Sequence, residues 1–230
     1  MDPAGILLQV PIFGDLARGD VEELLPHLSE RRFDAGATVW LEGDPADALY
    51  IIVEGTLKSF RLSLDGAEVI VALHAAVGVT GEVGLFHASQ TRQVNVTAMT
   101  QARCMLLRRG PLVTFLSRHP TAMERLLEQI CGVTVRTAYS FTGMAFDDIR
   151  HRAAGTLLAL ADEFGEPVPG GTRIRLELSQ RTLAALVAAS RENVNRALAP
   201  LFASGAISQG DAHFIVHDRR ALADYGEDAL

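Results

Sequence analysis

Residues 179–198, SQRTLAALVAASRENVNRAL, decide the fold of the C-terminal part of the chain. The pattern predicts a helix that begins at Ser179, a short break at Ala188-Ala189 and a second helix for which Ser190 is a good N-cap. The inward-facing apolar residues are Leu183, Leu186 and Val187 in the first helix, and Val194, Ala197, Leu198 and Leu201 in the second. The stretch therefore predicts two short helices joined by a tight turn.

The residues that follow complete a DNA-binding motif. Residues 206–216 alternate in polarity and predict a hairpin that turns at Gly210-Asp211. Two such helices and a hairpin form a winged helix-turn-helix, whose second helix enters the major groove with its N-terminal residues toward the bases. Arginine suits guanine, and glutamate accepts from cytosine. The candidate DNA-contacting residues are Ser179, Gln180, Ser190, Arg191, Glu192, Asn195 and Arg196.

The charge distribution favours sequence-specific binding over a general DNA coat. The 230 residues include 21 Lys and Arg against 28 Asp and Glu, a formal net charge of -7, whereas a protein that coats DNA is normally basic. Between Arg173 and Arg196, five arginines face only Glu177 and Glu192, a local charge of +3. Positive charge is thus concentrated where the motif needs it.

The N-terminal half has a different pattern. Short apolar or alternating runs over residues 33–110 are separated by Gly and Asp, with Asp65-Gly66 as a tight hairpin turn, and they predict a β-roll or barrel. Residues 20–28 predict a small helix ahead of it. The stretch 120–146 predicts a long helix, and its heptad seam consists of Met123, Leu127, Ile130, Thr134, Thr137, Phe141 and Met144. We expect this seam to pack against a second copy; the alternative is packing against the chain's own core.

Past this helix, residues 149–164 predict an amphipathic helix, EPVPGGT a loop and residues 173–178 a short strand. The predicted fold class is α+β. A sensor β-roll, or jelly roll, occupies residues 1–110, a dimerisation helix residues 111–146 and a winged helix-turn-helix domain residues 147–230.

The motifs resemble the cyclic AMP receptor protein / fumarate–nitrate regulator superfamily over nearly the whole chain. SRENVNRAL resembles its recognition helix, and EGDPADALYIIVEGTLK, TGEVGLF and TRQV resemble its cyclic-nucleotide-binding β-roll. The resemblance implies a homodimeric transcription regulator that meets RNA polymerase and reads a palindromic operator with TGTGA-like half-sites through Arg191, Glu192 and Arg196. One departure is Ala188, where the family commonly has Gly; with a positive φ, Ala there costs about 1 kcal/mol.

The β-roll carries groups suited to a cyclic phosphate and a ribose. Gly81 and Gly84 permit close approach of the backbone, Glu82 offers a carboxylate and Arg92 a cation. The resemblance implies that Glu82 takes the ribose hydroxyl, Arg92 the phosphate and Thr137 the adenine. Two positions depart from the family, because Gln93 and Ala138 stand where hydroxyl residues are usual. The candidate effector-binding residues are Gly81, Glu82, Val83, Gly84, Arg92, Gln93, Thr137 and Ala138. The effector is then cyclic AMP or another cyclic nucleotide; a different small molecule, or none, stays open.

Other classes have less support. The two cysteines, Cys104 and Cys131, form no metal or iron–sulfur motif, and no apolar stretch reaches membrane-span length, so we expect a cytoplasmic protein without a membrane partner or an obligatory cofactor. No nucleophile–base arrangement indicates an enzyme. A haem sensor would need one of His74, His87 and His119 as axial ligand. The rival hypothesis is a cyclic-nucleotide-binding module that acts through protein contacts.

Overall fold

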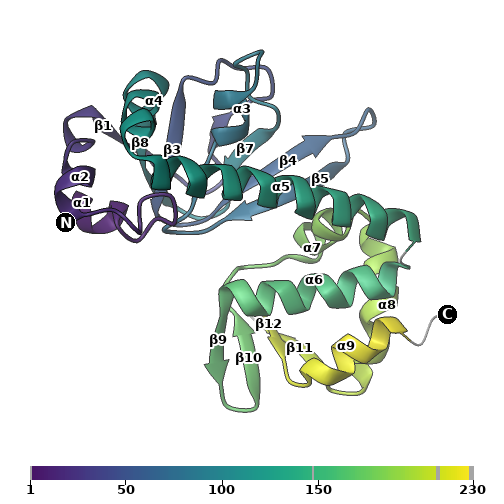
Figure 1. Ribbon diagram of the computed structural model, residues 1–230. Helices are drawn as coiled ribbons and strands as arrows, with labels where there is room; N and C mark the ends of the chain where they lie inside the picture. Colours follow the sequence, from purple (N-terminus) through teal and green to yellow (C-terminus); the bar gives the residue numbers. More distant parts are fainter. Residues whose placement is uncertain (1, 147, 211–212, 228–230) are drawn as a thin grey trace. The chain divides into compact units, whose positions relative to one another are not determined.

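The computed structural model describes residues 2–146, 148–210 and 213–227. By internal contacts the chain divides into two units (Figure 1). The first consists of Met1–Arg61 and Val71–Arg136, and the second of Leu62–Ile70 and Thr137–Leu230. The division between the units falls inside the long helix, near residue 137. We expected a domain to begin at Asp147, which lies outside the described residues. The domain boundaries of the sequence analysis stay a prediction.

Two four-stranded sheets make the β-roll, which lies in the first unit except for the end of β4 and the start of β5. One has the order β1-β8-β3-β6 and the other β2-β7-β4-β5. The strands are β1 (Leu28–Phe33), β2 (Thr38–Trp40), β3 (Ala48–Glu54), β4 (Leu57–Leu62), β5 (Glu68–His74), β6 (Val79–Thr80), β7 (Asn95–Ala98) and β8 (Ala102–Arg108). The connection from β4 to β5 spans residues 63–67 and is closed by a hydrogen bond from Ser63 N to Ala67 O of 2.9 Å, so it is longer than the tight turn expected at Asp65-Gly66.

Helices pack around this roll. They are α1 (Pro3–Leu7), α2 (Arg18–Glu22), the 3-10 turn η1 (Leu25–His27), α3 (Glu82–Phe86), α4 (Arg109–Arg118) and α5 (Pro120–Phe146). The single helix expected over residues 20–28 is wrong. Pro26 lacks an N–H, which an α-helix through this point would need, and the chain forms α2 and η1 before Leu28 begins β1.

Helix α5 confirms the predicted helix over residues 120–146, but its predicted seam is divided between two faces. Met123 and Ile130 pack against the core of the first unit, beside the buried Ala122 and Leu126. The exposed seam positions are Leu127, Thr134, Thr137 and Phe141, and the side chain of Met144 lies outside the described residues. The alternative of packing on the chain's own core thus holds for Met123 and Ile130.

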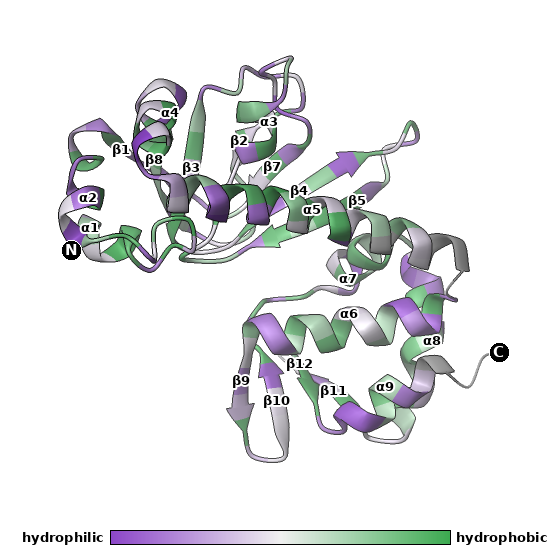
Figure 2. Ribbon diagram, in the orientation of Figure 1, coloured by the Kyte–Doolittle hydropathy of each residue, from purple (hydrophilic) through white to green (hydrophobic). Residues whose placement is uncertain are grey.

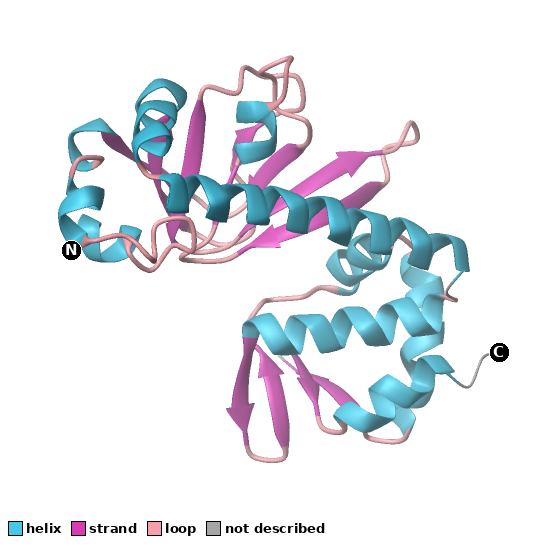
Figure 3. Cartoon of the chain, viewed as in Figure 1, coloured by secondary structure: helices cyan, strands magenta, loops and turns pink. Residues whose placement is uncertain are grey.

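The second unit contains a third four-stranded sheet, of order β11-β12-β10-β9 (Figure 3). Its elements are α6 (Ile149–Phe164), β9 (Gly165–Val168), β10 (Gly171–Ile174), α7 (Gln180–Val187), α8 (Arg191–Ala203), β11 (Ile207–Gly210), β12 (His213–Val216) and α9 (Arg219–Glu227). Two expectations are wrong here. EPVPGGT is not a loop, because Glu166 and Pro167 pair with Arg173 and Thr172, and the strand expected over 173–178 ends at Ile174. Asp211, at the expected wing turn, lies outside the described residues.

Among the described helices, none is both long enough and apolar enough to cross a membrane.

Candidate DNA-contacting helix and effector pocket

The N-terminus of α8 is built as the sequence predicts. The Ser190 side chain caps the helix by accepting a hydrogen bond from the Asn193 N–H at 3.3 Å. Val194, Ala197, Leu198 and Leu201 are buried. Consequently the opposite face is exposed, and it presents Arg191, Glu192, Asn195 and Arg196. Figure 2 shows hydrophilic and hydrophobic stretches along this helix.

The turn before α8 is strained. Ala188 closes α7 with φ 53° and ψ 50°, the left-handed region that favours glycine. This confirms the condition under which alanine is unfavourable at this position. The conformation reverses the chain within one residue and lets Ser190 start the next helix.

Fewer arginines are available for DNA than the five counted between Arg173 and Arg196 in the sequence. Arg173 forms an ion pair with Glu166, and Arg175 donates from Nε to the Phe164 carbonyl at 3.4 Å. Within the part of the chain that the structure describes, Arg191 and Arg196 have no ion pair. Ser190, Arg191, Glu192 and Asn195 line one surface hollow at the start of α8. The available charge is therefore concentrated on the helix that is expected to meet DNA.

Ser179 and Gln180 have structural partners of their own. The Ser179 hydroxyl accepts from the Thr182 N–H at 3.0 Å and so caps α7. Gln180 donates from Nε2 to Oε1 of Gln209 at 2.9 Å, and Gln209 in turn donates to the Leu178 carbonyl at 3.1 Å. These two hydrogen bonds connect the start of α7 to strand β11. Gln209 was missed by sequence reasoning because no local pattern joins two residues 29 positions apart.

In the β-roll, Glu82 is a buried carboxylate with an unused oxygen. It opens α3 directly after Gly81, whose φ of 94° lies in the left-handed region. Its residue is only 4% exposed, and its Oε2 atom has no hydrogen-bond partner among the described residues. Burial raises the pKa of Glu82, against which hydrogen bonds from its own backbone N–H and the Gln129 side chain act in the other direction. A hydroxyl donor from a ligand would satisfy this oxygen.

Arg92 is a buried cation with weak charge compensation. Its Nη2 donates to the Ala48 carbonyl at 2.9 Å and its Nη1 to the Gly81 carbonyl at 3.3 Å, while Nε has no partner in the described part of the chain. The guanidinium carbon lies 4.2 Å from the centre of the Trp40 ring. The nearest carboxylate is that of Asp47, at 3.8 Å and largely exposed. Burial lowers the pKa of Arg92, and a buried charge whose only ion-pair partner among the described residues is long and exposed favours binding of an anion.

The two glycines around Glu82 allow close packing. A Cβ at Gly84 would lie 2.6 Å from the Thr91 carbonyl oxygen, and a Cβ at Gly81 would lie 2.4 Å from Nη1 of Arg92. A larger residue at Gly81 would displace the Arg92 guanidinium, and one at Gly84 would displace the backbone of Thr91. Between them, the Val83 side chain is partly exposed at 38%.

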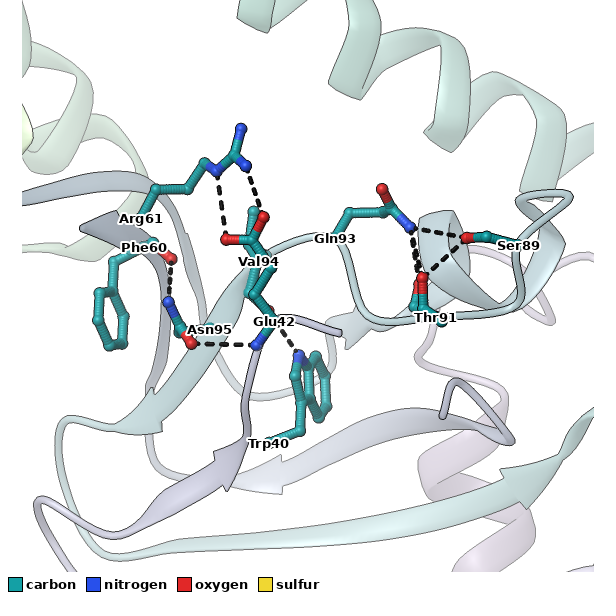
Figure 4. Close-up of polar contacts among 9 residues, drawn as sticks. All are labelled: Trp40, Glu42, Phe60, Arg61, Ser89, Thr91, Gln93, Val94 and Asn95. Carbon is teal, nitrogen blue, oxygen red and sulfur yellow. Dashed lines mark hydrogen bonds and ion pairs between the residues drawn. The ribbon is translucent and has the colours of Figure 1, made fainter. Parts of the chain in front are cut away.

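Gln93 is folded back on its own loop (Figure 4). Its Nε2 donates to the Thr91 carbonyl at 2.9 Å, and it also lies 3.2 Å from the Thr91 hydroxyl and 3.3 Å from the Ser89 hydroxyl. The same figure shows Trp40 donating from its ring N–H to the Val94 carbonyl, at 3.0 Å. Gln93 stands where the family usually has a hydroxyl residue, and its side-chain amide is held by Ser89 and Thr91. Of the α5 candidates, Thr137 and Ala138 are exposed and belong to the second unit.

The donor set fits a cyclic nucleotide. An unsatisfied carboxylate oxygen suits a ribose hydroxyl, and a poorly compensated guanidinium suits a phosphate. The histidines considered for haem all have protein partners: His74 bonds Ser59, His87 bonds Ser89 and His119 stacks on Phe115. No group of metal-ligating residues occurs among the described residues.

Comparison with known proteins supports both halves. The model of the cyclic nucleotide-binding domain matches residues 30–119, and that of the Crp-like helix-turn-helix domain matches residues 151–225. The chain is 32% identical over 218 residues to the CRP-like cAMP-activated global transcriptional regulator of Mycobacterium tuberculosis, covering 95% of this chain and 97% of that protein. It is 29% identical to the global nitrogen regulator of a Synechocystis species, over 87% of this chain and 89% of that one.

A solved structure agrees with the fold. The c-di-GMP-responsive global regulator CLP of Xanthomonas campestris superposes with a TM-score of 0.76 at 27% identity, covering 87% of this chain and 99% of that chain. With the winged helix-turn-helix, the β-roll and the long helix between them, the chain belongs to the cyclic AMP receptor protein / fumarate–nitrate regulator superfamily of transcription regulators.

Proposed function

We propose that this chain is a homodimeric, sequence-specific DNA-binding regulator whose operator affinity is controlled by a cyclic nucleotide. The observation that carries the proposal is the pair of buried, incompletely satisfied groups, Glu82 Oε2 and Arg92 Nε, in a chain that also exposes a free recognition helix. Such groups are unfavourable without a ligand, and a ligand that brings a hydroxyl donor and an anion would satisfy them.

On the DNA side, Arg191 and Arg196 are the proposed guanine-contacting residues and Glu192 the proposed cytosine acceptor. Their exposure and freedom from ion pairs within the described residues support this role. A homodimer would present two copies to half-sites of the TGTGA kind, about one helical turn apart. RNA polymerase is the further protein partner proposed.

Dimerisation is assigned to the exposed face of α5. Leu127, Val135 and Phe141 are 53%, 52% and 72% exposed on this helix. Exposed apolar side chains repeated along one long helix favour packing against a second copy. Gln129 and Arg136, which act on the Glu82 carboxylate, come from the same helix. A ligand at Glu82 would therefore bias a two-state arrangement of the dimer through α5.

Two relatives suggest different cyclic nucleotides. The Mycobacterium tuberculosis protein is named as cAMP-activated, and the Xanthomonas campestris protein as c-di-GMP-responsive. For this chain cyclic AMP is the first candidate, because one carboxylate and one guanidinium match one ribose hydroxyl and one cyclic phosphate. Gln93 is compatible with this, since its amide is held by Ser89 and Thr91.

A mobility-shift assay tests the proposal directly. A palindromic TGTGA-like duplex and a scrambled duplex of the same composition are compared at fixed salt, with and without cyclic AMP. We expect preferential binding of the palindrome, strengthened by the nucleotide. Equal binding of both duplexes would favour the rival module that acts through protein contacts.

Calorimetric titration separates the effector hypotheses. Cyclic AMP, cyclic GMP and c-di-GMP are titrated into the full chain. Binding of any of them supports a nucleotide sensor and identifies its class. Operator preference without binding of any nucleotide would indicate a regulator with another effector or with none.

A further inference from the structure

A polar cluster lies inside the β-roll beyond the groups already assigned to ribose and phosphate. The His74 imidazole, at the end of β5, contacts the Ser59 hydroxyl of β4 through Nε2 at 2.7 Å and the Thr80 hydroxyl of β6 at 3.4 Å. Ser59 and Thr80 are 4% and 3% exposed. Three strands thus contribute to one hydrogen-bonded group, which we call the His74 cluster: Ser59, His74 and Thr80.

The His74 cluster adjoins the effector pocket. Thr80 immediately precedes Gly81 and Glu82, and it is the cross-strand partner of Tyr50, whose ring lies 5.4 Å from the Arg92 guanidinium carbon. The charge of Arg136, on α5, acts on both His74 and Glu82.

Electrostatic interactions link Arg92, Glu82, His74 and Arg136 to one another. Arg92 interacts with Tyr50, Asp47, Asp44 and Glu82, whereas the charge that acts on His74 is that of Arg136. Glu82 is the group that interacts with both sides. Glu82 is thus acted on by Arg92 on one side and by Arg136, whose charge also acts on His74, on the other. A ligand whose anion pairs with Arg92 and whose hydroxyl bonds Glu82 would have a third part to place toward His74.

We infer that His74 is a specificity-determining residue that recognises the base of the effector by hydrogen bonding. The inference rests on the proposed nucleotide-sensing function. Nε2 of His74 is held by Ser59, which fixes the plane of the ring. A neutral imidazole keeps one donor and one acceptor, so the nitrogen that does not contact Ser59 can pair with a complementary atom at a base edge. A base without that atom would leave a buried polar group unpaired, which is how a polar site rejects a near-isostere.

The neutral state of His74 supports this role. Burial, with a further contribution from Arg136, lowers the pKa of His74 to about 4. At physiological pH the ring is therefore uncharged, and it can accept as well as donate. Arg136 is the cation whose charge acts on His74, and a guanidinium can donate to acceptor atoms of a base.

The competing interpretation is that the His74 cluster only holds β4, β5 and β6 together. The two interpretations differ in one readout, the ratio of affinities for nucleotides that differ only in the base. A structural role changes stability and leaves this ratio unchanged. A base-recognising role changes the ratio and leaves the contribution of the shared ribose and cyclic phosphate intact.

The test titrates cyclic AMP and cyclic GMP calorimetrically into the full-length wild type, His74→Leu and His74→Gln. We expect the wild type to discriminate between the two nucleotides by about tenfold or more. His74→Leu should bring their affinities to within about threefold of each other, and His74→Gln should retain part of the difference. Ser59→Ala/His74→Leu, which also removes the hydroxyl left without a partner, is the second variant in case His74→Leu alone folds poorly.

Glu82→Gln is the matched control, because its carboxylate serves the ribose common to both ligands. It should weaken both nucleotides and leave their ratio unchanged. An unchanged ratio in His74→Leu overturns the inference while the proposed function stands. If the wild type binds no cyclic nucleotide, the proposed function fails and the inference fails with it.

Discussion

The two functional regions of this protein place their charges in opposite surroundings. At the start of α8, Arg191, Glu192 and Arg196 are exposed and turned toward solvent. In the β-roll, Glu82 and Arg92 are 4% and 3% exposed, and each has an atom without a partner in the described chain. Water solvates the exposed charges of α8 in the absence of DNA, so leaving them unbound costs little free energy. The buried groups of the β-roll are unfavourable until a ligand supplies their missing hydrogen-bond or ionic partners. The difference supports the proposal that a ligand of the β-roll controls DNA binding.

The largest expected effect tests the exposed region. Arg191→Ala should remove the proposed bidentate guanine contact, worth about 1–3 kcal/mol, and in the proposed dimer the loss would occur twice, about 2–6 kcal/mol in all. Fluorescence anisotropy at fixed salt should show loss of discrimination between palindrome and scrambled DNA. Arg181→Ala, an exposed arginine on the preceding helix, is the control and should weaken both duplexes equally. Unchanged discrimination in Arg191→Ala would remove α8 from the role of recognition helix.

The next prediction concerns burial in the sensor. His74 has a pKa of about 4 in the folded chain against 6.5 ordinarily, so below pH 6.5 the unfolded chain binds a proton that the folded chain does not. Stability from this group is complete above pH 6.5 and falls toward pH 4, by about 2 kcal/mol between pH 6.5 and pH 5. Glu82 acts in the opposite sense, since its raised pKa favours the folded state at low pH and this contribution is lost as pH rises above 4.5.

Urea unfolding at several pH values isolates the His74 contribution. As the pH falls from 6.5 to 5, the free energy of unfolding of His74→Leu should rise relative to that of the wild type. Only the wild type loses stability through protonation of His74 in the unfolded chain. His87→Leu, at an exposed histidine of the same unit, should leave the pH dependence of the wild type in place. Parallel curves for wild type and His74→Leu would contradict the assigned burial.

A third prediction separates binding from stability. Arg92→Met should weaken cyclic nucleotide binding about 10- to 100-fold, the range for a lost hydrogen bond to a charged group. Its free energy of unfolding without ligand should stay the same or rise, because a weakly compensated buried charge is replaced by an apolar side chain of similar length. Arg108→Met is the control, since Arg108 is exposed and pairs with the same Asp47 at 3.4 Å. A large drop in the stability of Arg92→Met would identify Arg92 as a structural group.

The smallest expected effect lies in the turn of the DNA-binding motif. Ala188→Gly relieves the left-handed conformation at φ 53° and should stabilise the chain by up to about 1 kcal/mol. Operator affinity should not change, since Ala188 lies outside the face that α8 exposes. Thermal unfolding measures the gain, and Ala189→Gly, where φ is not positive, should destabilise instead.

Local sequence patterns predicted the exposed region better than the buried one. Ser190, Arg191 and the apolar residues of α8 follow from capping and helical spacing, which depend on neighbours along the chain. The hydrogen bonds of Gln93 to Ser89 and Thr91 are also local. The sequence does not predict whether the Gln93 side chain makes these bonds or points toward the effector site, because that depends on how the surrounding side chains pack. Of the predicted heptad seam, Met123 and Ile130 pack on the chain's own core, and packing of the exposed positions against a second copy stays a prediction, because spacing predicts which residues share a face and does not say what covers it.

The groups that were missed are assembled across strands. Trp40 lies 52 positions from Arg92 in the sequence, and Ser59 lies 15 positions from His74. Sequence reasoning considered His74 only as a haem ligand, because a lone histidine shows nothing of its surroundings. The β9–β10 hairpin was missed for a related reason: two prolines and two glycines in EPVPGGT favour a loop, and the pairing with Arg173 and Ile174 outweighs them.

We propose that the effector site of the β-roll and the exposed helix α8 are energetically coupled, and a reciprocal measurement tests this coupling. Cyclic AMP affinity is measured calorimetrically for the full chain with and without a saturating TGTGA-like palindrome, at one salt concentration. We expect the DNA-bound protein to bind the nucleotide more tightly, by the same factor by which the nucleotide raises operator affinity. Nucleotide that binds with equal affinity in both states would contradict it.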